Sequence, residues 1–283
     1  MIVPKKVQTA AAVARHYDEL DPFYREVWGE HVHHGLWRTG RESPREAVEA
    51  LIDHLAERLG LQHGQKACDI GCGYGGTARR LAERFGAHVT GLTISSVQAA
   101  RAQALAVNHP EVEILCRDWL QNGLPDTSFD RAWSIESSEH MEDKSRFFAE
   151  AFRVLRPGGR LGVYAWLSRE TPSMWEIRHL LEPICREGRL PGMGTESEYR
   201  EWAQAAGFRV IGFKDLSRNV RRTWTICAQR LARKLATRGD YRRFLLSARA
   251  ENRVFALTLP RLILAYRTDA MRYGLLVAEK PAH

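Results

Sequence analysis

Two short segments of the chain hold residue types that could bind a ligand and move a proton. Residues 69–76 read Asp-Ile-Gly-Cys-Gly-Tyr-Gly-Gly, and residues 136–140 read Glu-Ser-Ser-Glu-His. Glycines between a strand and a helix let the backbone pass close to a ligand, and the next helix offers free N–H groups. A carboxylate such as Glu139 can orient a nucleophile or act as a base, and a histidine such as His140 titrates near neutral pH.

The glycine segment alone is compatible with dinucleotide binding. Gly71, Gly73 and Gly76 satisfy the pattern G-x-G-x-x-G. A dinucleotide site also needs an acidic residue about 20 positions further on, to hold a ribose hydroxyl. That region reads Gly-Leu-Thr-Ile at residues 91–94 and contains no acid. The acidic residue that a dinucleotide site needs is therefore missing, and the glycine pattern alone does not support dinucleotide binding.

These residues must be positioned by alternating strands and helices. The apolar periodicity predicts a helix over 9–28, followed by a turn and interrupted at Asp21-Pro22, and a second helix over 44–60 that ends at Gly60. Further helices are predicted over 77–85, 96–108 and 144–155. Strands are predicted over 66–70, 87–92, 112–116, 129–135, 160–166, 208–213 and 272–279.

This order predicts an α/β fold with a doubly wound, seven-stranded, mostly parallel sheet and a helical cap between the last two strands. We expect one integrated domain, in which residues 1–43 cap the ligand and 44–167 form the binding core. Residues 168–206 add a second cap segment, and 207–283 hold the last two strands with a basic helical insertion. In such sheets ligands bind at the carboxyl ends of the strands.

The composition is that of a globular chain with an uneven charge. Of its 283 residues 44% are hydrophobic and 27% charged, and the net charge is +8. No apolar run is long enough for a membrane span, and the five scattered cysteines suggest reduced thiols, so we expect a cytoplasmic protein without a secretory signal. Residues 214–283 contain 16 Lys/Arg and 5 Asp/Glu. This excess could serve nucleic acid, an anionic lipid surface, an anionic substrate, or only solvated helix faces.

Several segments together resemble the class I S-adenosylmethionine-dependent methyltransferases. Asp69 directly before the glycines resembles their first motif, although the carboxylate that many of them carry after the second strand is missing. Residues 91–98, Gly-Leu-Thr-Ile-Ser-Ser-Val-Gln, resemble a segment of the cyclopropane-fatty-acid synthase and γ-tocopherol methyltransferase relatives. Residues 133–144 closely resemble a segment of the γ-tocopherol methyltransferases, with Glu142 in place of a proline. Residues 14–18 and 28–35 resemble the segment that closes over the cofactor in these families.

The resemblance implies S-adenosylmethionine as the cofactor and assigns roles to individual residues. The residues expected to bind the cofactor are Tyr17, His34, Asp69, Gly71, Gly73, Thr93, Gln98, Asp118, Trp119 and Ile135. Asp118 and Trp119 match the position that holds adenine, and Thr93 and Gln98 match positions that contact the sugar and tail. Glu139 is the first candidate for the catalytic residue and His140 the second, the alternative for His140 being a helix cap.

Other residues invite interpretations that the sequence favours less or leaves open. His31, His33 and His34 fit no common zinc spacing, so no metal is expected, and Cys68 and Cys72 are interpreted as packing residues. Four tryptophans could line an apolar acceptor pocket: Trp166, Trp175, Trp202 and Trp224. The segment 257–273 is amphipathic and aromatic. Its arginines, with Arg253 just before it, suit an anionic or phenolic acceptor with an apolar body; they are Arg253, Arg261, Arg267 and Arg272.

The favoured function is methyl transfer to carbon, oxygen or nitrogen of a small, partly apolar acceptor of the natural-product, isoprenoid or quinol type. A cyclopropane-synthase-like enzyme acting on lipids at a membrane surface is the main alternative, with weak peripheral membrane contact. An RNA methyltransferase is a further alternative, although no RNA-binding module is recognisable and no nucleic-acid partner is expected. A protein that keeps the cofactor but does other chemistry is the last. The acceptor, the methylated atom and the oligomeric state do not follow from the sequence.

Overall fold

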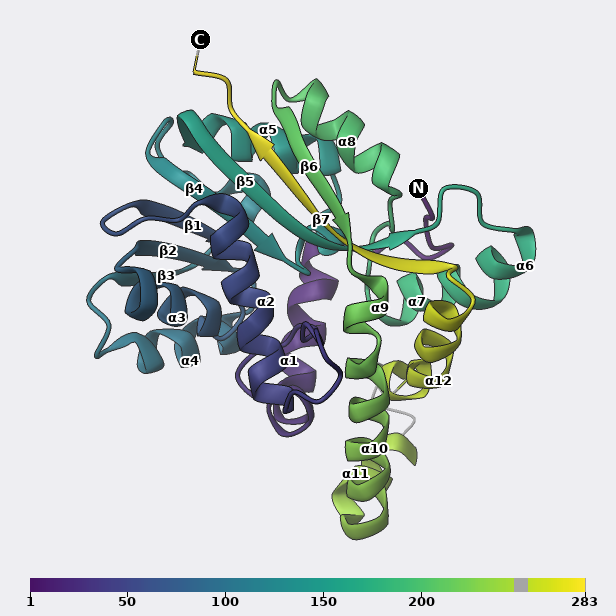
Figure 1. The fold of residues 1–283 in the computed structure, drawn as a ribbon. Helices are drawn as coiled ribbons and strands as arrows, with labels where there is room; N and C mark the ends of the chain where they lie inside the picture. Colours follow the sequence, from purple (N-terminus) through teal and green to yellow (C-terminus); the bar gives the residue numbers. More distant parts are fainter. Residues whose placement is uncertain (247–253, 283) are drawn as a thin grey trace.

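The computed structural model describes residues 1–246 and 254–282, and its centre is one seven-stranded sheet (Figure 1). The strand order is β3-β2-β1-β4-β5-β7-β6. Strands β1 to β5 pair in parallel, and β7 runs antiparallel to both of its neighbours. The strands are β1 Lys66–Ile70, β2 His88–Thr93, β3 Val112–Cys116, β4 Phe129–Ile135, β5 Leu155–Ser168, β6 Arg209–Asp215 and β7 Met271–Glu279. The predicted α/β sheet is confirmed, with small shifts at the strand ends.

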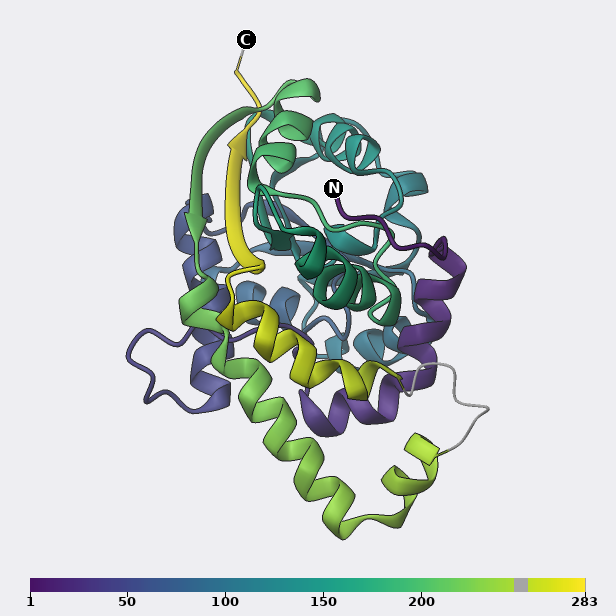
Figure 2. The ribbon, with the colours of Figure 1, turned by 90° about the vertical axis from the view of Figure 1, so that its right-hand side faces the viewer.

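Helices cover both faces of the sheet, as the doubly wound arrangement requires (Figure 1, Figure 2). One face carries α2 (Pro44–Leu59), α3 (Gly76–Phe85) and α4 (Ser96–Ala106), and the other carries α5 (Lys144–Val154) and α8 (Glu196–Ala205). The bounds of α2 follow from its sequence. Ser43 and Glu46 form a reciprocal capping box at its start, and Gly60 adopts a left-handed conformation at its end.

Two apolar clusters, one against each face of the sheet, form the core. The first joins α2 to the sheet through Leu51, Ile52 and Leu55, which are fully buried. A glycine stands at this contact, because a Cβ on Gly162 of β5 would lie only 2.7 Å from Leu55 Cδ1. The second cluster packs Phe147 and its neighbours on α5 against the opposite face. Apolar side chains therefore fill most of both faces, with one buried polar pair, His54 of α2 and Tyr164 of β5, joined by a hydrogen bond of 2.6 Å.

The N-terminal helix α1 (Ala10–Val27) continues through Pro22, so the predicted interruption at Asp21-Pro22 is wrong. Asp21 is buried, and its carboxylate accepts hydrogen bonds from Tyr74 Oη at 2.7 Å and from Arg25 Nε at 2.9 Å. These contacts hold the helix against the glycine turn. Tertiary packing thereby outweighs the hydrogen bond that a proline cannot donate inside a helix.

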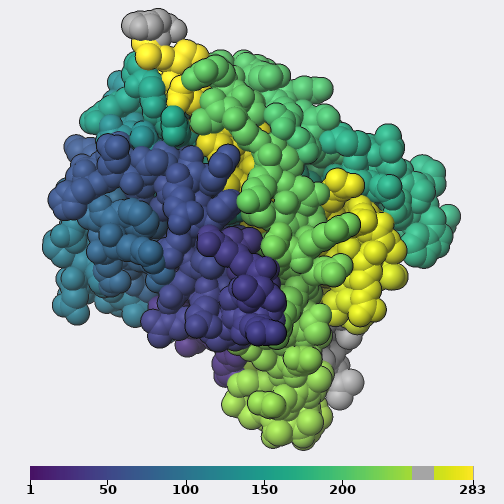
Figure 3. Space-filling view, in the orientation of Figure 1, coloured from purple at the N-terminus to yellow at the C-terminus, as the bar shows by residue number. Residues whose placement is uncertain are grey.

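Helices fill the connection between β6 and β7, which confirms the predicted helical cap between the last two strands. They are α9 (Ser217–Val220), α10 (Arg222–Thr237), α11 (Gly239–Leu246) and α12 (Val254–Arg267). Helices α10 and α11 project beyond the sheet (Figure 1, Figure 2). In Figure 3 the dark-blue N-terminal part of the chain lies against the green α9 and α10. Trp37 N donates to Asn219 O at 2.9 Å across this contact.

Between β5 and α8 the chain adds α6 (Met174–Glu176) and α7 (Glu182–Glu187), joined by one π-helical turn, Ile177–Leu181. This region packs against α12. In the described part of the chain, no helix combines the length and the apolar character needed to cross a bilayer.

We expect Leu55→Ala to lower the free energy of unfolding by about 2–5 kcal/mol, because it leaves a cavity between α2 and β5. Val107, which is 78% exposed, offers a matched control, since Val107→Ala should change stability by less than about 0.5 kcal/mol. Urea unfolding followed by circular dichroism measures both. Equal losses in the two variants would contradict this placement of the core.

Candidate active site

The glycine turn brings the carboxyl ends of β1 and β4 together. Gly71 has φ +79°, and a Cβ there would lie 2.2 Å from Ser137 Cβ, so only glycine fits. Ser137 Oγ in turn donates to Ile70 O at 2.5 Å. The segment after β4, which carries Glu139 and His140, is thereby fastened to the end of the turn. The two segments that the sequence marks for chemistry lie at one place in the fold.

A cavity of about 430 Å³ lies over the carboxyl ends of β1 to β4. Its polar wall includes a hydrogen-bonded pair, because Thr93 Oγ1 donates to Gln98 Oε1 at 2.9 Å. Predicted cofactor residues that line it are Tyr17, Gly71, Gly73, Thr93, Gln98, Asp118, Trp119 and Ile135. Asp69 and His34, also predicted to bind the cofactor, do not line it.

The donor and acceptor groups around this cavity suit S-adenosylmethionine. Gly73 has φ +54°, and a Cβ there would meet nothing closer than Gln98 Nε2 at 4.0 Å, so the turn leaves room for a ligand. Asp118 follows β3 and is half-buried beside the fully packed Trp119 ring. A carboxylate next to an aromatic ring can hold an adenine by its amino group and its face. The volume is within the usual range for ligand pockets.

Asp69 is placed behind the turn, away from the cavity. Its side chain is 3% exposed, and Oδ2 has no hydrogen-bond partner among the described residues. Burial raises the pKa of Asp69 to about 7. Direct contact of Asp69 with the cofactor stays a prediction.

A second, smaller cavity of about 30 Å³ adjoins the first, and its wall is mostly aromatic. The two cavities share Tyr17, Val32, Glu136 and His140. Trp166 and Trp224 line the smaller cavity, as the sequence interpretation suggested, with their rings 5.3 Å apart. Trp175 and Trp202 do not. Trp175 is 55% exposed on α6, and Trp202 packs against Tyr199 of α8.

Glu139 faces the smaller cavity and is almost completely buried. Its Oε1 accepts from Trp166 N at 2.5 Å, and its Oε2 accepts from Ser138 Oγ at 3.2 Å. Burial raises the pKa of Glu139 to about 7, although the Trp166 backbone N–H works in the opposite direction. A carboxylate with that pKa can take up a proton and release it near neutral pH.

His140 forms a hydrogen-bonded pair with Tyr17 of α1. His140 Nδ1 lies 3.3 Å from Arg189 O, and since a carbonyl can only accept, this nitrogen carries the proton. Nε2 is therefore the acceptor for Tyr17 Oη, 2.9 Å away. Burial lowers the pKa of His140 to about 4, so the ring is neutral at pH 7. Tyr17 stands between His140 and any ligand proton.

Glu136 is the residue that the sequence interpretation missed. It adopts φ +54°, which is strained for a non-glycine residue, and its carboxylate borders both cavities. Oε1 accepts from His34 N at 2.7 Å and from Tyr273 Oη at 2.8 Å, while Oε2 accepts from Trp166 Nε1 at 2.9 Å. His34 Nδ1 lies 2.9 Å from Oε2.

These donors decide the charge of Glu136. Burial alone would raise the pKa of Glu136, but the electrostatic and hydrogen-bond interactions with His34 outweigh it and lower the pKa to about 2. The site thus contains a permanently ionised carboxylate, Glu136, beside one that titrates near neutrality, Glu139. Its left-handed backbone and its partners, up to 137 positions away, leave no pattern in the sequence.

The remaining candidates lie away from the two cavities or have other partners. No group of three potential metal ligands exists in residues 1–246 and 254–282. Cys68 and Cys72 are buried packing residues. The arginines of the predicted acceptor segment do not line either cavity: Arg261 pairs with Glu187, Arg272 pairs with Asp215 at 3.3 Å, Arg267 is exposed, and Arg253 lies outside the described residues.

The strand order, the glycine turn and the cavity above it define a class I S-adenosylmethionine-dependent methyltransferase of small molecules. Residues 4–242 match the family model of mycolic acid cyclopropane synthetase. The chain belongs to this family, in the group that also includes tocopherol O-methyltransferases and sterol methyltransferases.

Similar proteins cover the chain almost completely. Chloroplastic tocopherol O-methyltransferase of Arabidopsis thaliana is 31% identical, with 95% of this chain and 82% of that protein covered. The 27-O-demethylrifamycin SV methyltransferase of Amycolatopsis mediterranei (strain S699) is 32% identical over 96% and 98% of the two chains. Among solved structures, mycolic acid cyclopropane synthase CmaA1 with SAH and CTAB has TM-score 0.84 at 25% identity, covering 98% of this chain and 100% of that chain. The [4+2]-cyclase SpnF has TM-score 0.82 at 30% identity, with both chains fully covered.

We expect the stability advantage of Glu139→Gln over the native chain to grow between pH 5 and pH 8. The folded pKa of Glu139 lies near 7, above its ordinary value of 4.5, so the protonated carboxyl favours folding and this contribution is lost as the pH rises through about 7. The difference can reach about 3 kcal/mol, since each pKa unit corresponds to about 1.4 kcal/mol. Thermal unfolding across this pH range measures it. A difference that is constant with pH, as expected for exposed Glu113→Gln, would show that Glu139 keeps its ordinary pKa.

Glu136→Gln should lower the free energy of unfolding by about 2–4 kcal/mol, because a neutral amide cannot accept from all the buried donors that face it. Glu113→Gln on β3, which is exposed, is the matched control and should change little. Urea unfolding at pH 7 distinguishes the two. A loss no larger than in the control would rule out the buried ionic role of Glu136.

Proposed function

We propose that this enzyme transfers the methyl group of S-adenosylmethionine to a small, neutral, partly apolar acceptor, at oxygen, carbon or nitrogen. One observation carries the proposal. The cavity that suits the cofactor and the aromatic cavity share Tyr17, Val32, Glu136 and His140, so a donor in one would meet an acceptor in the other at this wall. Glu139 faces the acceptor side of the wall.

The reaction needs alignment and, for most acceptors, removal of one proton. The acceptor atom forms a bond to the methyl carbon while the carbon–sulfur bond breaks, which leaves S-adenosylhomocysteine. We propose that Glu139 takes up the proton of the acceptor, because its carboxylate has a pKa near 7 and lines the smaller cavity. His140 and Tyr17 would orient the acceptor, because Nε2 of His140 is already engaged by the Tyr17 hydroxyl.

The charges in the wall favour a neutral acceptor. Glu136 stays ionised, and an anion placed beside it in a dry cavity would be repelled, whereas the sulfonium cation of the donor would be attracted. Among the arginines that suggested an anionic acceptor, Arg261 and Arg272 are paired and Arg267 is exposed, and none of these three lines this cavity. A phenol or enol with its proton in place, or an electron-rich carbon, fits better against the aromatic wall of the smaller cavity.

The relatives support small-molecule acceptors of varied structure. Their names give tocopherol, a demethylrifamycin and sterols as the compounds methylated. For the cofactor we propose contacts from the eight predicted residues that line the larger cavity, with Gly71 and Gly73 at the amino-acid tail and Asp118 and Trp119 at the adenine. His34 and Asp69 would support the site from behind.

We expect Glu139→Gln to lower methyl transfer at least about 100-fold, as for the loss of a general base. Its affinity for S-adenosylhomocysteine should be unchanged, because Glu139 does not line the cofactor cavity. The measurement is transfer of a labelled methyl group to a panel containing a tocopherol precursor, a phenolic polyketide and a sterol, with calorimetry for the cofactor product.

Glu113→Gln serves as the control and should retain full activity. Unchanged turnover in Glu139→Gln would remove the base assignment. Conversion of an acceptor without loss of the donor's methyl group would instead place the enzyme with the cyclase SpnF in chemistry.

A further inference from the structure

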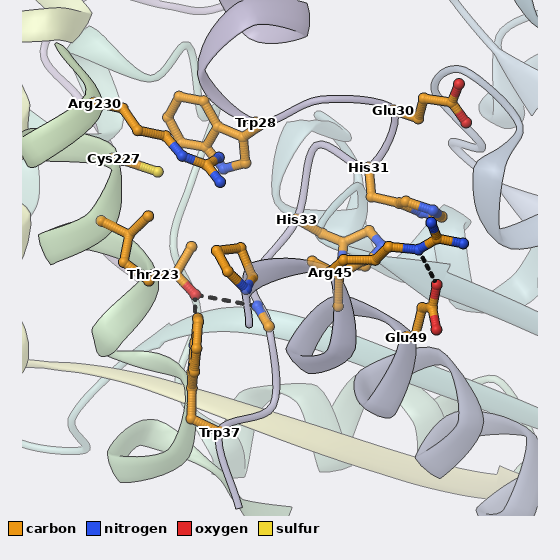
Figure 4. A pocket seen from close by; sticks show the side chains of 14 residues that line it. Trp28, Glu30, His31, His33, Trp37, Arg45, Glu49, Thr223, Cys227 and Arg230 are labelled. Carbon is orange, nitrogen blue, oxygen red and sulfur yellow. Dashed lines mark hydrogen bonds and ion pairs between the residues drawn. The ribbon is translucent and has the colours of Figure 1, made fainter. Parts of the chain in front are cut away.

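The cavity over the carboxyl ends of the strands is called the cofactor cavity below, and the smaller aromatic one the acceptor cavity. A third cavity, of about 430 Å³, lies on the other side of Trp28 from the acceptor cavity. Its walls come from residues 30–37, the start of α2 and one side of α10 (Figure 4). Trp28 borders both this cavity and the acceptor cavity, whereas no residue is shared with the cofactor cavity. The third cavity is therefore a neighbour of the acceptor only.

The sizes of the two cavities differ in a way that matters for the acceptor. The acceptor cavity has room for about 30 Å³, less than a tenth of the space behind Trp28. It leaves little room for the body of a larger acceptor. The cavity behind Trp28 falls in the usual range for a small-molecule ligand. An acceptor whose reactive end reaches Glu139 must place the rest of its body elsewhere, and this space adjoins.

His33 supplies an unused hydrogen-bond acceptor at this cavity. Its side chain is 7% exposed, and Nδ1 lies 2.9 Å from the carbonyl oxygen of His34. Because a carbonyl only accepts, Nδ1 carries the proton, and burial keeps the ring neutral by lowering the pKa of His33. Nε2 is then an unprotonated acceptor, and it has no partner among the described residues. A ligand group that donates would satisfy it.

Thr223 of α10 offers the complementary group. Its Oγ1 accepts from Gly35 N at 3.1 Å and from Trp37 Nε1 at 3.3 Å, as the dashed lines in Figure 4 show. With two donors on the oxygen, its own hydroxyl hydrogen remains for a third partner. His33 and Thr223 thus present one acceptor and one donor, the combination that a hydroxyl group on a ligand matches.

The His31 ring, which also lines the cavity, packs edge-on against His33 with the ring centroids 5.3 Å apart. Most of the remaining wall is apolar or already paired. Trp28, Trp37 and Val48 provide flat and aliphatic surface. Glu49 pairs with Arg45 at 2.7 Å and Glu30 with Arg79 at 3.0 Å, so neither carboxylate is left to bind a cation. Arg230, which donates to Val27 O, is the one cation on this wall without a carboxylate partner in the described residues. It makes an anionic ligand the alternative that an experiment must separate.

We propose that the cavity behind Trp28 binds the part of the acceptor remote from the methylated atom, and that this part is a neutral ring system carrying hydroxyl groups. This inference rests on the proposed function, because it takes the ligand of the cavity to be the methyl acceptor. Trp28 then separates the reacting end from the body, and His33 and Thr223 select acceptors by their hydroxyl groups.

Three probes with one skeleton test the proposal: 2,6-dihydroxynaphthalene, 2,6-dimethoxynaphthalene and naphthalene-2,6-dicarboxylate. Each is titrated by calorimetry into the full chain saturated with S-adenosylhomocysteine. The dihydroxy probe should bind at least about fivefold more tightly than the other two, the value of one hydrogen bond near 1 kcal/mol. His33→Asn, which keeps a donor near the Nδ1 position but removes Nε2, should lose this preference. His33→Gln, which restores an amide at the Nε2 position, should regain it.

The controls separate this proposal from misfolding and from the proposed function. Exposed His88→Asn at the start of β2 should bind all probes as the native chain does, and every variant should keep its affinity for S-adenosylhomocysteine. Equal binding of the dihydroxy probe by the native chain and His33→Asn would overturn the proposal, as would tighter binding of the dicarboxylate, which would assign the cavity to Arg230. If no acceptor is methylated, the proposed function is contradicted. The calorimetric titrations then still decide whether this cavity binds hydroxylated ring systems.

Discussion

The buried carboxylate of Glu136 is the interaction on which the arrangement of the site depends. Removing a carboxylate from water costs several kcal/mol unless donors replace the lost hydration. Here the donors come from His34 in the N-terminal segment, Trp166 on β5 and Tyr273 on β7. Each donor anchors a different part of the chain to the end of β4. Satisfying one charge therefore brings the N-terminal segment, β5 and the antiparallel strand β7 to the same point.

Two glutamates three positions apart divide the chemical work because their surroundings differ. Donors surround the Glu136 carboxylate and keep it ionised, whereas Glu139 has fewer donors and is governed by burial. Opposite pKa shifts in adjacent groups are how one site holds a fixed charge and a titrating base together. The neutral Tyr17–His140 pair completes the wall without adding charge. This combination suits a cationic donor and a neutral acceptor.

Aromatic rings partition the space on the acceptor side. Trp28 stands between a small cavity and a larger one in which His33 Nε2 lacks a partner among the described residues.

The sequence by itself determined the order of strands and helices and the glycine turn, because each depends on neighbours close in the chain. The eight cofactor residues followed from the resemblance, and the fold brings them to one cavity. The helix through Pro22, the charge of Glu136 and the cavity behind Trp28 were decided only by the tertiary structure. Asp21 is held by Tyr74, 53 positions away, and Glu136 by Tyr273, 137 positions away. Hydrogen bonds between such distant residues leave no periodicity in a single sequence, and whether a carboxylate is ionised depends on them.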